Sequence, residues 1–181
     1  DMRKFYANDK IKFFIGNVRE TDSIKNAMYG VDYVFHAAAL KQVPSCEFFP
    51  IQAVKTNILG SENVIRSSVR AGVKNIVILS TDKAVMPVNA MGMTKALMEK
   101  VAQAEMRGAA QLNTIVSCVR YGNVMYSRGS VIPLFIKQIQ SGLPLTVTDA
   151  AMTRFMLPLD QAVDLVLFAL KNSKPGDIFV R

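Results

Sequence analysis

The alternation of short apolar runs with helical patterns constrains the fold more than any other feature of this sequence. Three short runs in which apolar residues predominate and stand at adjacent positions occupy 31–37, 75–80 and 115–119. Apolar residues recur at helical spacing over 51–70, 89–106 and 160–170. Strands that are apolar on both faces belong to a parallel sheet that helices cover on both sides. The sequence therefore predicts an α/β, doubly wound fold.

The glycines predict that one part of such a fold lies outside this sequence. A doubly wound fold that binds a dinucleotide carries a Gly-rich turn between its first strand and its first helix. None of the ten glycines belongs to such a cluster, and the chain begins at Asp1 in mid-pattern, with a short β-rich run over 11–15. We therefore expect the first β-α-β unit to be missing, and the 181 residues alone to bind a dinucleotide weakly.

The composition favours a small anionic partner. The chain carries 22 basic and 14 acidic residues, for a net charge of +8, but no run of five basic residues. Scattered charge of this kind fits a sugar nucleotide or a dinucleotide better than a nucleic acid. The apolar runs are too short to span a bilayer, residues 1–4 show no signal-peptide pattern, and Cys46 and Cys118 show no metal spacing. We expect a cytoplasmic protein with no membrane segment.

Four polar residues stand at the end of the strand predicted at 75–80 and directly after it, and they are Ser80, Thr81, Asp82 and Lys83. The carboxyl edge of a parallel sheet, where α/β folds place their active sites, is the predicted position for them. Asp82 and Lys83 could divide acid and base work if their surroundings separate their pKa values. A surface ion pair on a turn is the alternative interpretation.

Two residues at the start of the next predicted helix, Met91 and Lys95, lie four positions apart and share one helical face. Short-chain dehydrogenases carry Tyr and Lys at this spacing, with Tyr as the acid/base and Lys on the nicotinamide ribose. Met cannot transfer a proton. Met at helical spacing is also typical of a core position, and Lys of a surface position.

Small residues end the run at 31–37. His36 is followed by Ala37, Ala38 and Ala39, and small side chains let the backbone approach a ligand closely. His36 is the only histidine, and we interpret it as a supporting residue, since a lone histidine is more often structural than catalytic.

Seven segments in order are similar to one enzyme family. They begin at His36, Lys55, Ser80, Met91, Arg120, Arg128 and Met152 and have the sequences HAAALKQV, KTNILG, STDKAV, MGMTK, RYGNV, RGSVIP and MTRF. Together they resemble the UDP-N-acetylglucosamine 4,6-dehydratases of bacterial surface-polysaccharide pathways, which are extended short-chain dehydrogenases/reductases. The chain resembles most the soluble capsular branch, whose members are also 5-epimerases.

The resemblance implies an organisation and a reaction. It implies a partial Rossmann-like domain over 1–125 that carries the catalytic residues, and a smaller, partial substrate lobe over 126–181. The implied cofactor is NADP, with NAD possible, and the implied substrate is UDP-N-acetylglucosamine. The sugar is oxidised at C4, loses water across C5 and C6, and is inverted at C5, although retention at C5 stays open. A homo-oligomer is expected.

The resemblance also implies catalytic roles. Lys83 resembles the base that removes the C5 proton, and Asp82 the acid that protonates the departing C6 hydroxyl. Thr81 resembles the residue that bonds the C4 hydroxyl, and Lys95 the lysine on the ribose. Because Met91 stands at the Tyr position, the acceptor of the C4 hydroxyl proton stays open between Lys95, Asp82 and a water held by Thr81.

The implied binding residues complete the prediction. Cofactor contacts are expected from Asn17, Val18, Ala37, Ala38, Ala39, Asn57 and Lys95. Substrate contacts are expected from Lys41, Asn123 and Arg154. The guanidinium fork of an arginine suits phosphate oxygens, so Arg154 is expected at the diphosphate together with Asn123.

Two other functions are compatible with the fold. The first is a non-catalytic, dinucleotide-binding regulator, which the loss of the Tyr would fit. The second is a simple nucleotide-sugar epimerase or reductase, which usually keeps the Tyr and lacks an acid–base pair after the strand. The adjacent Asp82 and Lys83 argue against both.

Overall fold

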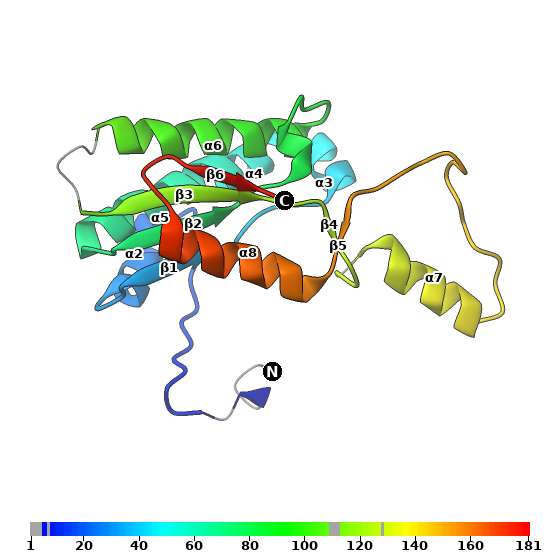
Figure 1. Ribbon diagram of the computed structural model, residues 1–181, viewed down its shortest axis with the longest axis horizontal. Coiled ribbons are helices and arrows are strands. Elements are labelled where there is room, and N and C mark those ends of the chain that lie inside the picture. Colours follow the sequence, from blue (N-terminus) through cyan, green and yellow to red (C-terminus); the bar gives the residue numbers. More distant parts are fainter. Residues whose placement is uncertain (1–4, 7, 109–112, 128) are drawn as a thin grey trace.

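A four-stranded parallel sheet forms the centre of the molecule (Figure 1). The structure, a computed structural model, describes residues 5–6, 8–108, 113–127 and 129–181. The sheet has the order β1-β2-β3-β6, with β1 (Tyr33–His36), β2 (Asn75–Leu79), β3 (Ile115–Arg120) and β6 (Ile178–Val180). Beyond the end of β3, a second parallel pair joins β4 (Asn123–Val124) to β5 (Met156–Leu157).

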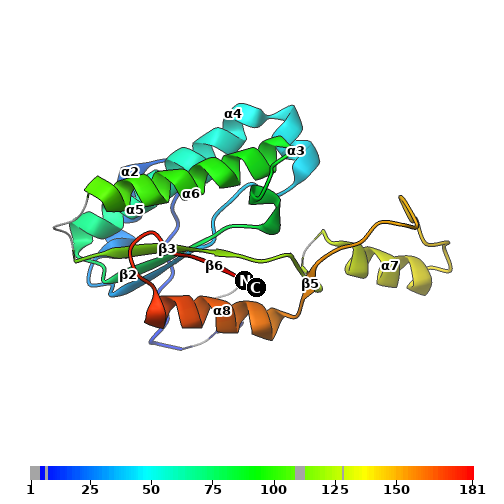
Figure 2. The ribbon, with the colours of Figure 1, turned by 45° about the horizontal axis from the view of Figure 1, so that its top comes forward.

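Helices cover both faces of the central sheet. The α-helices are α2 (Thr21–Lys25), α3 (Val43–Phe48), α4 (Pro50–Ala53), α5 (Gly60–Ala71), α6 (Ala90–Gly108), α7 (Val131–Gln140) and α8 (Leu159–Asn172). Short 3-10 turns occupy Asn26–Met28 and Asp82–Ala84. Figure 2 shows α5 and α6 on one face of the sheet and α8 on the other. The predicted α/β, doubly wound class is confirmed.

The two sides of β2 contribute to two apolar cores. Ile76 and Ile78 pack with Met98 of α6 on one face, whereas Val77 packs with Val166 of α8 on the other. Because successive side chains of a strand point to opposite faces, a strand between two layers of helices must be apolar at consecutive positions. This explains the four consecutive apolar residues at 76–79.

The strand predicted at 31–37 is confirmed, although not its burial on both faces, whereas the one at 11–15 is wrong. The run at 31–37 forms β1, but Tyr33 and Phe35 are 58% and 49% exposed, so β1 is buried on one face only. The reason is that α8 contacts β2 and β3, and no described element covers that face of β1. The run at 11–15 forms no strand, because it finds no ladder partner among the described residues, and Ile15 is 95% exposed.

The predicted helix over 51–70 forms with a change of hydrogen-bond pattern inside it. Its middle, Val54–Leu59, is a π-helical segment between α4 and α5. Such segments are rare and often mark functional sites, because the wider turn redirects side chains. Here the segment carries Asn57, which is fully buried.

The segment between β4 and α8 is less enclosed, whereas α8 and β6 pack on the central sheet. Helix α7 projects away from the sheet in Figure 1, and none of its residues is buried. The predicted boundary between two domains near residue 125 stays a prediction. At this position β4 pairs with β5 and joins the two parts of the chain. Across the described ranges, no helix combines the length and the apolar character that a bilayer crossing requires.

Candidate active site

A pocket of about 550 Å³ opens at the carboxyl ends of β1, β2 and β3, which is the predicted edge of the sheet. Its volume is typical of a small-molecule site. It is lined by residues that follow the three strands and by the first turns of α6, among them Ala37, Ala39, Lys41, Ser80, Thr81, Lys83, Met91, Lys95, Tyr121, Gly122 and Asn123. Tertiary structure therefore gathers most of the predicted site residues around one cavity.

Lys95 is the most deeply placed cation of this pocket. Its side chain is 6% exposed, and its Nζ donates to the backbone oxygen of Leu79 at 2.7 Å. Burial lowers the pKa of Lys95 to about 8. Met91, one turn earlier on α6, is 5% exposed, lines the same pocket and packs on Cys46. A thioether at this position fills space and cannot carry a proton.

Thr81, Asp82 and Lys83 form one hydrogen-bonded turn at the pocket. Lys83 Nζ donates to Asp82 Oδ1 at 3.0 Å, and Thr81 Oγ1 donates to the same oxygen at 2.8 Å. Burial works to raise the pKa of Asp82, but these two hydrogen bonds outweigh it and lower that pKa below its ordinary value. The resting turn therefore holds a carboxylate bound to an ammonium group.

Asn123 extends this group from the neighbouring strand. Its Oδ1 accepts from Lys83 Nζ at 3.2 Å, so the side chain expected at a diphosphate here orients the lysine. The sequence separates Asn123 and Lys83 by 40 positions. Because β2 and β3 are parallel neighbours, the turns that follow them lie side by side.

Asn57 fastens the loop after β1 to α6. Its Oδ1 accepts from the backbone nitrogen of Leu40 at 2.8 Å, and its Nδ2 donates to the Leu40 oxygen and to Thr94 Oγ1, both at 3.0 Å. These three bonds fix Ala37 and Ala39 beside the first turn of α6. The π-helical segment places Asn57 where it reaches both elements.

His36 lies behind the pocket as a neutral group. Its Nε2 lies 2.9 Å from Ser61 Oγ, and Ser61 Oγ donates to the backbone oxygen of Asn57 at 2.8 Å. Because the Ser61 proton is used in that bond, His36 is assigned the Nε2–H tautomer. Burial, with a smaller contribution from the charge of Lys95, lowers the pKa of His36 to about 4.

Gly92 permits the close contact between α6 and the Asp82–Lys83 turn. A Cβ atom at this position would lie 2.3 Å from the backbone oxygen of Lys83, far inside van der Waals contact. Asn89 Oδ1 accepts from the Gly92 nitrogen at 2.8 Å and fixes the first turn of α6. Only a residue without Cβ lets the helix start this close to Lys83.

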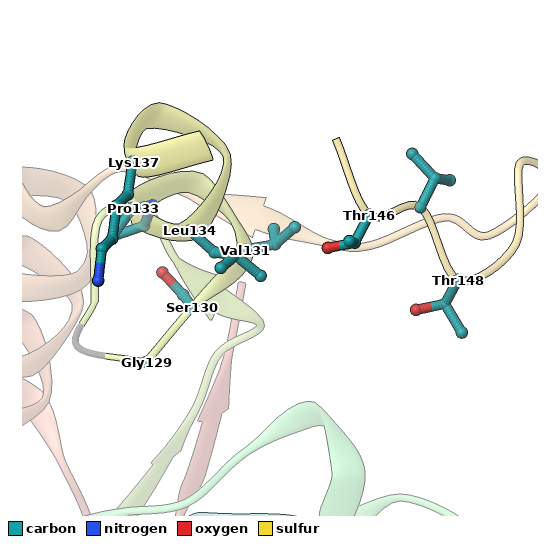
Figure 3. Close-up of a pocket in the computed structure, with 9 residues that line it drawn as sticks. Gly129, Ser130, Val131, Pro133, Leu134, Lys137, Thr146 and Thr148 are labelled. Atoms are coloured by element: carbon teal, nitrogen blue, oxygen red, sulfur yellow. The ribbon is translucent and has the colours of Figure 1, made fainter. Parts of the chain in front are cut away.

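A second hollow of about 670 Å³ adjoins the first beside α7. Figure 3 shows Val131 and Leu134 of α7 on one side and Thr146 and Thr148 of the following segment on the other. Among the residues that the structure describes, Lys137 is the only ionisable one in its lining, so the pocket of Lys95 is the stronger candidate for chemistry. Gly129 and Ser130 line both, which makes the two hollows neighbours.

Several predicted residues lie outside these hollows. Arg154 is exposed and its Nη1 donates to the adjacent Thr153 oxygen at 2.7 Å. Asn17 and Val18 lie against α5, where Asn63 Nδ2 donates to the Val18 oxygen at 3.0 Å. Ala38 does not line the pocket, and Arg128, which opens one of the seven segments, lies outside the described residues.

Glu99 and Arg120, for which the sequence predicted no role, form an ion pair at the back of the site in which Glu99 is buried and Arg120 is 24% exposed. The spacing of four between Lys95 and Glu99 was the available signal, because it places both on one face of α6. Within the described part of the chain, no cluster of three or more His, Cys, Asp or Glu side chains could hold a metal ion.

Comparison with known families decides the affiliation. The family model described as "Polysaccharide biosynthesis protein" matches residues 1–181, the whole chain. The chain belongs to this polysaccharide biosynthesis protein family. A family relative from Rickettsia prowazekii, named UDP-glucose 4-epimerase, is 58% identical over 181 residues, which are all of this chain and 53% of the relative. A relative of the same name from Rickettsia akari is 57% identical with the same coverage.

The chain spans about half the length of the curated relatives it matches. Among solved structures, Pen from Bacillus thuringiensis is similar over 99% of this chain and 57% of its own, with a TM-score of 0.95 and 41% identity. A dTDP-glucose 4,6-dehydratase from Streptomyces venezuelae, solved with NAD and TYD, has a TM-score of 0.88 at 24% identity over 99% of this chain and 60% of its own. The second likeness is one of fold.

Proposed function

We propose that the chain is the catalytic part of a nucleotide-sugar 4,6-dehydratase that acts on UDP-N-acetylglucosamine and inverts C5. The observation that carries the proposal is the Asp82–Lys83 ion pair, whose Lys83 lines the same pocket as Lys95. The relatives named for a UDP-sugar enzyme support this class of substrate. The enzyme is proposed to act in the cytoplasm, as a homo-oligomer.

The pocket fits one end of a nicotinamide dinucleotide, either NADP or NAD. Lys95 offers a buried donor, and Ala37 and Ala39 leave the adjacent wall free of bulky side chains. When bound, the nicotinamide would take the hydride from C4 of the sugar and would return it to C6 after water has left, so that the cofactor ends in its oxidised form and C5 gains a proton. Lys95 would hold the ribose, and the loop 37–41, fixed by Asn57, would support it from the other side.

Elimination of water needs a base at C5 and an acid at the C6 oxygen. In the resting pair, Lys83 holds the proton and Asp82 is ionised. One proton shift along the 3.0 Å hydrogen bond gives a neutral amine and a carboxylic acid. Lys83 then takes the C5 proton, Asp82 gives its proton to the leaving hydroxyl, and water departs. Asn123 keeps the lysine in line through its 3.2 Å bond.

Among the three candidates for the acceptor of the C4 hydroxyl proton, Lys95 fits best. Its pKa of about 8 leaves a fraction of neutral amine near pH 7, which suits a base that must later return the proton. Asp82 is already bound to Lys83 and Thr81. The second hollow, which adjoins the pocket at Gly129 and Ser130, offers space for the nucleotide.

A UDP-glucose 4-epimerase is the second candidate, and the names of the Rickettsia relatives favour it. A 4-epimerase needs oxidation and reduction at C4 but no base at C5, so it leaves Lys83 without a function. A regulator that only binds a dinucleotide leaves both Asp82 and Lys83 without one.

The test is incubation of a protein of the relatives' full length, carrying this sequence, with each UDP-sugar in heavy water. A 4-keto, 6-deoxy product from UDP-N-acetylglucosamine with deuterium at C5 supports the proposal. NMR coupling constants then distinguish the inverted L-arabino sugar from the retained D-xylo sugar. Conversion of UDP-glucose to UDP-galactose, with no deuterium at C5, would establish the epimerase instead. Cofactor binding without either product would indicate a regulator.

A further inference from the structure

Glu99 of α6 is a buried carboxylate whose two oxygens are both occupied. Its side chain is 3% exposed. Oε1 accepts from Ser80 Oγ at 2.5 Å and from Arg120 Nε at 2.8 Å, and Oε2 accepts from Arg120 Nη2 at 2.5 Å. This is a bidentate, charge-assisted pair with an added hydroxyl donor, the strongest polar arrangement available to these groups.

The partners of Glu99 stand directly before the two turns that carry the pocket's polar groups. Ser80 precedes Thr81, Asp82 and Lys83, and Arg120 precedes the turn that presents Asn123. The same face of α6 makes a second attachment one turn earlier, where Lys95 Nζ bonds the Leu79 oxygen at 2.7 Å. Helix α6 is therefore fastened twice to the end of β2 and once to the end of β3.

We infer that Glu99 is a positioning residue, which holds the turns after β2 and β3 at a fixed distance from Lys95 through Ser80 and Arg120. The inference rests on the proposed function, because it assumes that Lys83 and Lys95 act on one substrate. It adds to that function a structural unit, Ser80–Glu99–Arg120, which sets the spacing between the base at C5 and the lysine near C4.

Stability alone is a weak explanation for this unit. Buried ion pairs lose much of their attraction to the cost of desolvation, and apolar replacements of both partners are often as stable. What an apolar pair cannot supply is the directed geometry of a bidentate pair. The unit contacts the ends of the two strands whose following turns carry Lys83 and Asn123, and Glu99 lies one helical turn from Lys95. A fixed geometry at this location sets the relative positions of the groups proposed to act on the substrate.

The charge of Glu99 also acts on Lys95. The groups around Lys95 are His36 from β1, Cys118 and Arg120 from β3, and Glu99 from α6 itself. Burial lowers the pKa of Lys95, and electrostatic interactions with Cys118 and with Glu99 oppose this. Because burial raises the pKa of the Cys118 thiol to about 12, that thiol is neutral near pH 8, whereas the Glu99 carboxylate is charged. Loss of the Glu99 charge should therefore lower the pKa of Lys95 further.

The first experiment follows Lys95 directly, by NMR titration of its side-chain amine. In Glu99→Gln the titration midpoint should fall by about 0.5 to 1 pH unit, as expected for loss of a nearby opposite charge. Glu105→Gln is the matched control, because Glu105 lies on the same helix but pairs with the exposed Arg66. Its midpoint should equal that of the parent. An unchanged midpoint in Glu99→Gln would contradict the inference.

The second experiment separates positioning from stability in the full-length enzyme. Glu99→Gln should lower kcat by about 10- to 100-fold with a smaller change in KM, because a misplacement of about 1 Å costs rates of this order. Glu99→Asp, which keeps the charge, should recover part of kcat. The pair Glu99→Gln/Arg120→Gln should recover the urea midpoint but not kcat. Full recovery of kcat in that pair would reduce Glu99 to a structural role.

The outcomes also distinguish this inference from the proposed function. A protein that transforms no UDP-sugar would refute the function, and the Lys95 titration would still decide whether Glu99 acts on Lys95. If Glu99→Gln fails to fold, Glu99→Asp carries the comparison: it keeps the charge but shortens the side chain by one methylene, so the Lys95 midpoint should stay near that of the parent while kcat falls. A kcat equal to that of the parent in Glu99→Asp would contradict the inference.

Discussion

Helices α6 and α7 each carry one apolar face, yet the described chain buries only the first. On α6, Met98 and Ala102 are 0% and 2% exposed and belong to the core between the helix and the sheet. On α7, Leu134 and Ile139 are 47% and 64% exposed. An amphipathic pattern thus predicts a helix, but it does not determine which surface covers its apolar face.

The same contrast holds for the polar residues near each helix. Lys95 and Glu99 lie against the ends of β2 and β3 and have defined partners. Within the described part of the chain, Arg154, in the segment after α7, donates to its neighbours Thr153 and Met152. The catalytic half of the proposed site is therefore built by contacts within the chain, whereas the substrate half depends on how residues 125–159 are held.

The largest expected effect tests whether the catalytic half of the proposed site, which packs against the ends of β2 and β3, carries the chemistry. Lys83→Ala in the full-length enzyme should slow water loss by about 10²- to 10⁴-fold, because the base at C5 is removed. Oxidation at C4 should continue, seen as transient absorbance of the reduced cofactor, since Lys95 is intact. Lys171→Ala, on the exposed end of α8, is the control. Equal rates of product formation in the two variants would refute the role of Lys83.

Because the core is packed and α7 is exposed, replacing an isoleucine by alanine should lower the free energy of unfolding much more in the core than on α7. Ile65→Ala, in the core at 0% exposure, should lower the free energy of unfolding by about 2 to 5 kcal/mol through lost burial and a cavity. Ile139→Ala on α7 should change it by less than about 0.5 kcal/mol. Urea unfolding of the 181-residue chain measures both. A similar loss in the two variants would show that α7 is packed in solution.

Burial of Lys95 predicts a dependence of stability on pH. The pKa of Lys95 is 10.5 in the unfolded chain and about 8 in the folded one. Between pH 8 and pH 10.5 the unfolded state therefore binds more protons than the folded state. The free energy of unfolding should therefore rise with pH across this window relative to Lys95→Met, by about 1 to 3 kcal/mol in total. The difference between the two proteins should be constant below pH 8. Parallel curves from pH 7 to 10 would mean that Lys95 is not buried.

The smallest expected effect concerns a strained loop between the Asp82–Ala84 turn and α6. Met86 has a φ of +47° and is 87% exposed, so its backbone is left-handed without a compensating contact. Met86→Asn should raise the free energy of unfolding by about 0.5 kcal/mol, because Asn tolerates this region. Val88→Asn, equally exposed but without positive φ, is the control and should give no gain. A gain in both would point to surface polarity of the loop instead of backbone strain.

The sequence by itself determined the α/β class and most elements of the central sheet. The mostly apolar runs at 75–80 and 115–119 are typical of strands that helices cover on both faces, and both runs form strands. The positions of Asp82, Lys83 and Lys95 at the sheet edge followed from the same argument, because polar residues after a buried parallel strand must emerge at its carboxyl end.

Tertiary structure alone decided which distant residues meet. The bonds from Asn123 to Lys83 and from Asn57 to Leu40 and Thr94 join separate elements, and no local periodicity encodes them. The strand expected at 11–15 did not form, because a strand depends on hydrogen bonds to a neighbour that its own sequence does not contain. The Ser80–Glu99–Arg120 unit is decided in the same way, by the packing of α6 across two parallel strands.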